Sequence, residues 1–194
     1  MSDPRRTLEP DYFDALYAAD ADPWNFGTSP YERAKYSLTL DALPKPRYRS
    51  ALEVGCSIGV LTRSLASRCD AVVAIDAAQT PLVEARRRCI DLPGVRFEQM
   101  FVPDQWPDGA FDLILLSEVV YYLNPEDVGR LAARVTHSLA EGGCVILVHW
   151  TGLTNYPLSG DEAANIFIER IGSTCFVERA DRYAEFRLDV LSRA

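Results

Sequence analysis

The chain has 194 residues, which is enough for one domain with a full hydrophobic core and short for two. Its net charge is −8 and no clustered basic face is apparent, which argues against binding of duplex nucleic acid. No stretch resembles a membrane span or a signal peptide, and the five cysteines include no C-x-x-C pair. We therefore expect a cytoplasmic protein without nucleic-acid or membrane partners, present as a monomer or a weak homodimer.

The N-terminal part of the chain is predicted to be helical. Residues 8–20 and 31–43 have helical apolar spacing, and Pro30 suits a first helical turn. Between them, DADPWNFGTSP is rich in turn-forming residues. We expect residues 1–45 to form a helical cap, joined to the rest by a linker in PKPRYRS, residues 44–50.

From Ala51 the pattern changes to short Val/Ile/Leu-rich runs separated by helical segments, which indicates a parallel sheet covered on both faces. After these runs, residues 174–193 alternate on either side of DRYA, which predicts an antiparallel hairpin. The predicted fold is α/β, with a doubly wound, mostly parallel seven-stranded sheet in a single domain whose core spans residues 50–150. The strands are predicted at 51–54, 71–76, 95–100, 111–117 and 144–150, and the helices at 60–68, 80–90, 125–140 and 161–171.

Two glycines follow the first predicted strand, in LEVGCSIGVLT. Ligands of doubly wound folds bind beyond the carboxyl ends of the strands, and glycine lets a ligand approach the backbone there. Gly55 and Gly59 therefore indicate a nucleotide-like ligand, although a tight turn with positive φ would also require them. A dinucleotide site needs glycines at 55, 57 and 60, but Ser57 and Val60 stand at two of these positions, so NAD is disfavoured.

Asp76 ends the second predicted strand, 23 residues after Glu53. A carboxylate at this point can accept hydrogen bonds from both hydroxyls of a ribose, or it can cap the helix that follows. The pattern E-x-G-x-x-x-G with an acid after the second strand fits S-adenosylmethionine (SAM).

These motifs resemble those of the class I SAM-dependent methyltransferases. The resemblance implies SAM as cofactor, S-adenosylhomocysteine (SAH) as product and an antiparallel last strand inserted in the sheet. Within that class the chain is similar to the NodS family, which N-methylates the free amine of a partly deacetylated chitin oligosaccharide. The loop HWTGLTNYPLSGDE, where acceptor residues commonly lie, does not share this similarity. The class resemblance is carried by the glycine turn, Asp76, FDLILLSEVVYYLNPED (111–127) and LAEGGCVILVHW (139–150). The similarity to NodS is carried by DPW (22–24), P-x-E-R (30–33), LEVGC (52–56) and EVVYYL (118–123).

The resemblance also implies which residues bind the cofactor. Arg33 is expected to pair with the methionine carboxylate, because a guanidinium matches carboxylate geometry, although it also fits a surface position. Phe101 and Val102 are expected beside the adenine, with core packing as the alternative. The full predicted set is Glu53, Gly55, Cys56, Ser57 and Gly59 at the glycine turn, Asp76 and Ala77 at the ribose, Phe101 and Val102, Ser117 at the junction of cofactor and acceptor, and Trp24, Tyr31 and Arg33 in the cap.

Glu118, Tyr122 and His149, near the ends of the fourth and fifth strands, are the candidate catalytic residues. Methyl transfer mainly requires alignment of the acceptor atom with the methyl group, and an amine must also be neutral to attack. His149 is placed ahead of Glu118 because an imidazole titrates near neutral pH, and either residue has a structural alternative.

The class of acceptor is inferred from the side chains and metal ligands that could activate the acceptor atom. No compact His/Asp/Glu constellation for a metal is visible, which favours an amine or an acidic hydroxyl as the acceptor. The predicted function is SAM-dependent N-methylation of a small-molecule or saccharide amine. O-methylation of a metabolite or sugar, and a non-catalytic SAM-binding module, are the alternatives.

Overall fold

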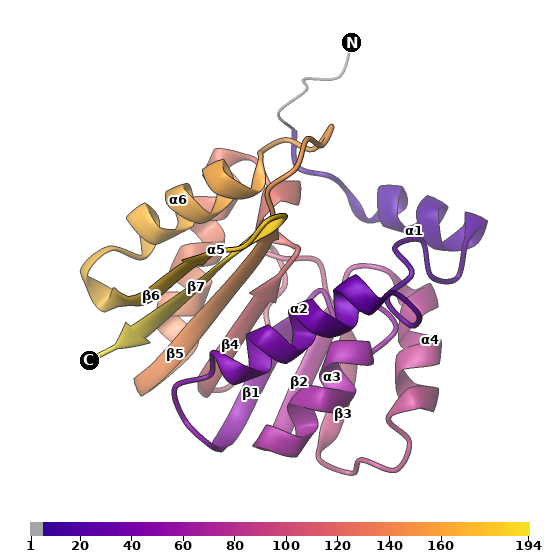
Figure 1. Ribbon diagram of the computed structural model, residues 1–194, viewed down its shortest axis with the longest axis horizontal. Helices are drawn as coiled ribbons and strands as arrows, with labels where there is room; N and C mark the ends of the chain where they lie inside the picture. Colours follow the sequence, from indigo (N-terminus) through magenta and orange to yellow (C-terminus); the bar gives the residue numbers. More distant parts are fainter. Residues whose placement is uncertain (1–5) are drawn as a thin grey trace.

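The computed structural model describes residues 6–194, so any expectation for residues 1–5 lies outside the described part of the chain. Seven strands form one sheet in the order β3-β2-β1-β4-β5-β7-β6, with helices on both faces (Figure 1). The strands are β1 (Tyr48–Val54), β2 (Cys69–Asp76), β3 (Val95–Gln99), β4 (Phe111–Ser117), β5 (Leu139–Trp150), β6 (Cys175–Arg182) and β7 (Phe186–Arg193). The helices are α1 (Pro10–Ala19), α2 (Pro30–Asp41), α3 (Val60–Leu65), α4 (Gln79–Arg88), α5 (Pro125–Ser138) and α6 (Gly160–Ile171), with short 3-10 turns η1 (Ala66–Arg68), η2 (Val120–Tyr122) and η3 (Gly172–Thr174).

The sheet confirms the predicted doubly wound, mostly parallel topology. β1 pairs in parallel with β2 on one side and with β4 on the other, so the strand order reverses at this point. β7 runs antiparallel between β5 and β6, as expected for the terminal hairpin. The carboxyl ends of β1, β2, β4 and β5 therefore meet at one edge of the sheet, where ligands of such folds bind.

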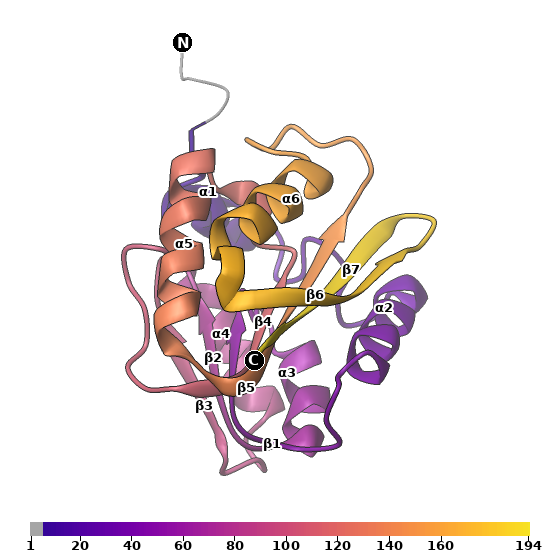
Figure 2. The ribbon, with the colours of Figure 1, turned by 90° about the vertical axis from the view of Figure 1, so that its left-hand side faces the viewer.

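Alternating strand residues bury both faces of the sheet. In β4, Leu113 packs in the same core as Leu65 of α3, whereas its neighbour Ile114 packs in the core that contains Leu131 of α5. Seen along the sheet in Figure 2, α5 and α6 lie on one side, and α2 and α3 on the other. This two-sided burial explains the near-continuous apolar runs of the sequence.

Three helices that position the site begin at strong caps. The Ser29 hydroxyl accepts a hydrogen bond from the Glu32 amide at the start of α2, and the Asn124 side chain accepts one from Asp127 at the start of α5. Ser159 forms a capping box at the start of α6. α2 and α5 also begin with proline, which suits the first helical position.

The segment expected to form a helical cap contains α1 and α2, and α1 lies beyond the carboxyl ends of the strands (Figure 1). Leu8 donates its amide to the Tyr122 carbonyl at 2.9 Å, and the Tyr17 hydroxyl lies 2.5 Å from Ser57 Oγ. The predicted linker is shorter than expected, because Tyr48 is buried and begins β1. Across residues 6–194, the helices are too short or too polar to cross a bilayer.

Candidate active site

A cavity of about 390 Å³ lies at the carboxyl ends of β1, β2 and β4, under the segment that carries α1 and α2. Its position is the point at which the strand order reverses. Arg33, Gly59 and His149 are the predicted residues that do not line it. The predicted residues that do are Trp24, Tyr31, Glu53, Gly55, Cys56, Ser57, Asp76, Ala77, Phe101, Val102, Ser117, Glu118 and Tyr122.

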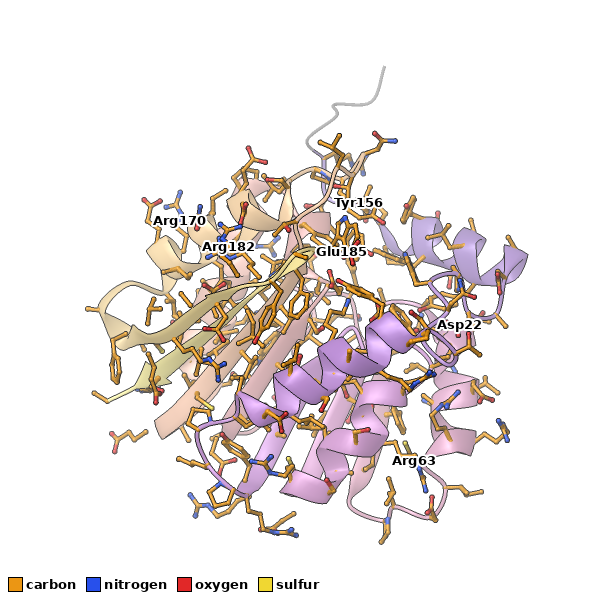
Figure 3. The ribbon with its side chains drawn as sticks, viewed as in Figure 1. Asp22, Arg63, Tyr156, Arg170, Arg182 and Glu185 are labelled. Carbon is orange, nitrogen blue, oxygen red and sulfur yellow. The ribbon has the colours of Figure 1, made fainter. Side chains whose placement is uncertain are left out.

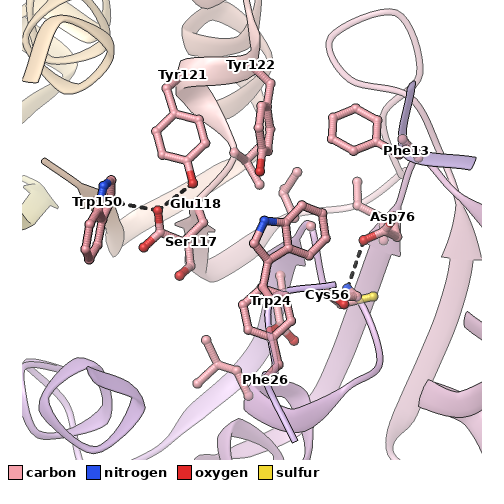
Figure 4. Close-up of a pocket in the computed structure, with 18 of the residues that line it drawn as sticks. Phe13, Trp24, Phe26, Cys56, Asp76, Ser117, Glu118, Tyr121, Tyr122 and Trp150 are labelled. Carbon is pink, nitrogen blue, oxygen red and sulfur yellow. Dashed lines mark hydrogen bonds between the residues drawn. The ribbon is translucent and has the colours of Figure 1, made fainter. Parts of the chain in front are cut away.

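Asp76 is fixed at the end of β2 by two backbone amides, one of which is drawn in Figure 4. Ser57 donates to Asp76 Oδ2 at 2.8 Å, and Ala78 donates to Oδ1 at 3.0 Å. Helix α4 has Ala78 as its N-cap, so Asp76 is not the helix cap that the sequence offered as an alternative. Burial raises the pKa of Asp76 to about 6, so this carboxylate carries its charge at neutral pH and faces the cavity.

Glu53 lies at the base of the cavity with an unsatisfied oxygen. Its side chain is buried, its Oε2 has no hydrogen-bond partner, and burial raises its pKa to about 8. A buried polar atom without a partner is costly, and a donor on a bound ligand would remove that cost. The neighbouring Gly55 has a φ of +78°, and a Cβ there would lie 2.3 Å from Val119 Cγ2. Glycine is therefore required for this turn.

Gly59 has a different role from the one predicted. It is the N-cap of α3 with a φ of +76°, and a Cβ there would lie 3.0 Å from the Cα and Cβ of Ala85. Gly59 therefore allows α3 to pack closely against α4 and does not line the cavity.

Glu118 lies at the opposite end of the cavity from Asp76, with Trp24 between them (Figure 4). It has a φ of +57°, a left-handed conformation that is unusual for this residue type. Its Oε1 accepts a hydrogen bond from Lys35 Nζ at 2.7 Å. Its Oε2 accepts from the Tyr121 hydroxyl at 2.7 Å and from the Trp150 amide at 2.9 Å. Three donors thus hold this carboxylate in one orientation.

Lys35 takes the place in the cavity that the sequence analysis gave to Arg33. Arg33 is exposed and donates to the Thr28 carbonyl at 2.8 Å, outside the cavity. Lys35 lines the cavity with a side chain that is 3% exposed, and it also pairs with Glu32 Oε1 at 3.0 Å. Sequence reasoning missed Lys35, although Glu32, Lys35 and Thr39 recur at the spacing of one buried helix face.

His149 lies beneath the cavity and not in it, which contradicts its predicted placement. Its side chain is 0% exposed, and Nε2 accepts a hydrogen bond from the Val120 amide at 3.3 Å. Burial lowers the pKa of His149 to about 4, so it is neutral at physiological pH. From this position it holds the Val120 amide in the turn after Glu118 and does not line the cavity.

Aromatic side chains form the wall beyond Glu118. Tyr156 stacks on Tyr121 with ring centroids 5.1 Å apart, and it meets the Tyr122 ring edge-on at 4.7 Å. Phe13 of α1 meets Tyr122 at 5.0 Å. Figure 3 shows Tyr156 at the end of the sheet where β4 and β5 finish, whereas Arg63 lies towards the other end.

Negative charge exceeds positive charge in the lining of the cavity. Among the described residues, its carboxyl groups are Glu32, Glu53, Asp76 and Glu118, and its cationic side chain is Lys35. Glu53, with a pKa of about 8, is mostly protonated at neutral pH, so the excess of negative charge comes from the other three carboxylates against Lys35. Within residues 6–194, no three His, Cys, Asp or Glu side chains are grouped so as to hold a metal ion.

The sequence also matches a known family. A family profile described as Nodulation protein S (NodS) matches residues 13–146, which is more than half of the chain. The chain belongs to the NodS family. Nodulation protein S of Rhizobium tropici is 33% identical over 131 residues, which cover 66% of this chain and 55% of that protein. The chain thus spans about half the length of the curated NodS relatives it matches.

Solved structures share the fold of this NodS-family chain. A Pseudomonas syringae structure described as a candidate methyltransferase is 38% identical, with a TM-score of 0.75 over 84% of this chain and 99% of that one. The N-methyltransferase NodS of Bradyrhizobium japonicum WM9 in complex with SAH is 20% identical, with a TM-score of 0.82 over 94% of this chain and 97% of that one. The fold is therefore that of the class I SAM-dependent methyltransferases, as expected from the sequence.

Proposed function

We propose that this chain is a SAM-dependent methyltransferase that methylates the amine nitrogen of a small-molecule or saccharide acceptor. The excess of carboxylates over cationic groups in the cavity carries this proposal. SAM brings a sulfonium and an ammonium, and an N-methylated product is itself a cation. A cavity of net negative charge is favourable for all three.

The residues at the Asp76 end fit SAM. Asp76 presents a carboxylate to the ribose hydroxyls, and Glu53 offers its unpaired Oε2 to a donor group. Gly55 leaves the turn free of a side chain, so that the methionine portion can approach the backbone. Phe101 and Val102 flank the space for the adenine; the Phe101 amide is already donated to Gln105 at 2.8 Å.

The chain contributes to the reaction mainly by placing groups. SAM supplies an activated methyl group, so the protein has to align the nitrogen lone pair with it and keep that nitrogen neutral. As the methyl group transfers, positive charge develops on the nitrogen. Glu118 stabilises this charge from a fixed orientation, because Lys35, Tyr121 and the Trp150 amide hold it before the substrate arrives.

The state of the candidate bases favours an amine over a hydroxyl. A hydroxyl acceptor needs a group that removes its proton. Glu118 already accepts three hydrogen bonds, and His149 is buried outside the cavity. An amine requires no such base, because deprotonation by solvent before binding gives the reactive form.

The test is methyl transfer from labelled SAM to matched pairs of acceptors that differ only in bearing an amine or a hydroxyl, such as glucosamine and glucose. We expect label in the amine of each accepted pair and none in its hydroxyl partner. An Asp76→Ala variant is the control for cofactor-dependent transfer. Preferential labelling of the hydroxyl compounds, or of neither, would refute the proposal.

A further inference from the structure

We infer that the acceptor end of the cavity is a subsite for alkylated ammonium groups. The acceptors would then include secondary and tertiary amines as well as primary ones, and a methylated product could be methylated again. This inference rests on the proposed function and extends it from the reaction to the class of acceptor.

The hydrogen bonds of Glu118 are the first observation. Both of its oxygens already accept, from Lys35 at 2.7 Å, from the Tyr121 hydroxyl at 2.7 Å and from the Trp150 amide at 2.9 Å. A site for a primary ammonium would offer free acceptors to three N–H donors. A tertiary ammonium has a single N–H group and a quaternary one has none. Such ions need net negative charge nearby rather than free acceptor atoms. Glu118 and Glu32 share one cation, Lys35, which leaves this group of three side chains with an excess of negative charge.

The rings around Glu118 are the second observation. Tyr121, Tyr122 and Tyr156 pack together on this side of the cavity, at centroid distances between 4.6 and 5.1 Å. Aromatic faces attract alkylammonium ions, and groups of rings recognise methylated ammonium groups in this way. The wall formed by α2 already holds a cation in this manner, because Lys35 Nζ lies 5.2 Å from the centroid of the Tyr31 ring.

The sulfonium of SAM is also a cation, so rings near it could serve the cofactor. Asp76 and Glu118 lie on opposite sides of Trp24 (Figure 4), and Tyr156 stacks on Tyr121 on the Glu118 side. Tyr156 belongs to the loop between β5 and α6 and not to the glycine turn. This arrangement assigns it to the acceptor. The sulfur of SAH is uncharged. Binding of a cation to the SAH-bound protein therefore reports recognition of the acceptor and not of the sulfonium.

The chemistry balances for each class of amine. The nitrogen lone pair forms a bond to the methyl carbon while the carbon–sulfur bond breaks and leaves its electron pair on sulfur. A primary or secondary amine then loses one N–H proton to solvent. A tertiary amine becomes a quaternary ammonium and loses no proton, so no base is required at any stage.

The direct test is calorimetry on protein saturated with SAH, with choline as the probe and 3,3-dimethylbutan-1-ol as its uncharged counterpart of the same shape. We expect choline to bind at least tenfold more tightly than the alcohol. Tyr156→Leu should reduce that preference severalfold, Tyr156→Phe should keep it because the ring remains, and SAH affinity should be unchanged in both. Tyr183→Leu, in the β6–β7 turn outside the cavity, is the matched control. Equal binding of choline and the alcohol, or an unchanged preference in Tyr156→Leu, would overturn the inference.

A second arm separates this inference from the proposed function. Glucosamine and its N-methyl and N,N-dimethyl forms are offered with SAM, and the products are identified by mass spectrometry. Transfer to the methylated forms supports the inference. Transfer to glucosamine alone, with no choline preference, overturns the inference and leaves the proposed function intact. Transfer to no amine overturns both.

Discussion

The two ends of the cavity are built in different ways. At the cofactor end, Gly55 directly follows β1, Asp76 ends the adjacent β2, and backbone amides hold the Asp76 carboxylate. At the acceptor end, Lys35 and Glu118 are 83 residues apart in sequence and meet through side chains, and the rings come from separate segments. The cofactor end is thus a property of the strand ends, whereas the acceptor end depends on how α1, α2 and the loop after β5 pack.

The largest expected effect tests the cofactor end by itself. Asp76→Ala removes a charged acceptor for two ribose hydroxyls, each hydrogen bond being worth about 1.5–3 kcal/mol, so SAH affinity should fall more than about 100-fold. Calorimetry measures this, with Asp70→Ala at the exposed, opposite end of β2 as the control. Because the pKa of Asp76 is about 6, the affinity of the unaltered protein should also weaken as the pH falls below that value. An unchanged affinity in Asp76→Ala would remove this residue from the site.

A second prediction concerns the free energy of unfolding of the cofactor-free protein. Burial raises the pKa of Glu53 from 4.5 to about 8, so the folded chain keeps a proton that the unfolded chain releases between these values. The free energy of unfolding should therefore fall as the pH rises from about 4.5 to 8, by on the order of 4 kcal/mol.

Chemical denaturation across this pH range, with Glu53→Gln as the comparison, measures the effect. The variant should lack this decline, because its amide does not titrate. SAH should reduce the decline in the unaltered protein, because a bound donor satisfies Glu53 Oε2. Parallel pH profiles for the two proteins would show that Glu53 is not the group responsible.

The third prediction tests whether a change at the acceptor end can lower turnover without changing the affinity of the cofactor end for SAH. His149→Leu leaves the buried Val120 amide without an acceptor, which costs about 1–3 kcal/mol and loosens the turn that carries Glu118 and Tyr121. Turnover should fall while SAH affinity stays the same. His149→Gln, which can still accept from Val120, should retain most of the turnover.

The pH–rate profile decides between bracing and base catalysis for His149. A histidine with a pKa of about 4 contributes no titration near neutral pH. If turnover depends on a group titrating near pH 6.5 that both variants lose equally, His149 acts as the base and the account of the acceptor end is wrong.

The smallest expected effect concerns the cap that spans both ends. The Tyr17 hydroxyl contacts Ser57 Oγ at 2.5 Å and joins α1 to the glycine turn. Tyr17→Phe should destabilise this closure by about 1 kcal/mol and speed amide hydrogen exchange in α1. SAH should slow exchange over residues 8–40 in the unaltered protein. Ala15→Ser, at an exposed position of α1, is the control. Equal exchange with and without SAH would mean that the cap does not respond to the cofactor.

The sequence predicted the cofactor end well, because its residues follow strands with clear apolar patterns. Gly55 and Asp76 line the cavity where their strands end. Gly59 was predicted to contact the ligand, but in the structure its positive φ allows α3 to pack against α4. Both roles require glycine, so the sequence does not distinguish them. The predicted linker extended too far, to residue 50. Tyr48 lies in a charged stretch without the apolar pattern that would have predicted the start of β1 there.

The acceptor end was predicted less well, for a physical reason. Whether Arg33 or Lys35 faces the cavity depends on the rotation of α2, and two residues along a helix change the direction of a side chain by about 200°. His149 ends a strand at the correct edge, but alternation along β5 turns it away from the cavity while Trp150 lines it. These outcomes depend on tertiary packing, which a single sequence does not reveal.

The central claim is that the carboxylate-rich cavity directs methyl transfer to nitrogen. The most direct test is the reaction of ¹³C-methyl-labelled SAM with glucosamine, which carries an amine and hydroxyls on one molecule, followed by NMR to locate the labelled methyl group. We expect the label on the nitrogen, and we expect an Asp76→Ala reaction to remain unlabelled at the same SAM concentration. Label on an oxygen of the same molecule would contradict it.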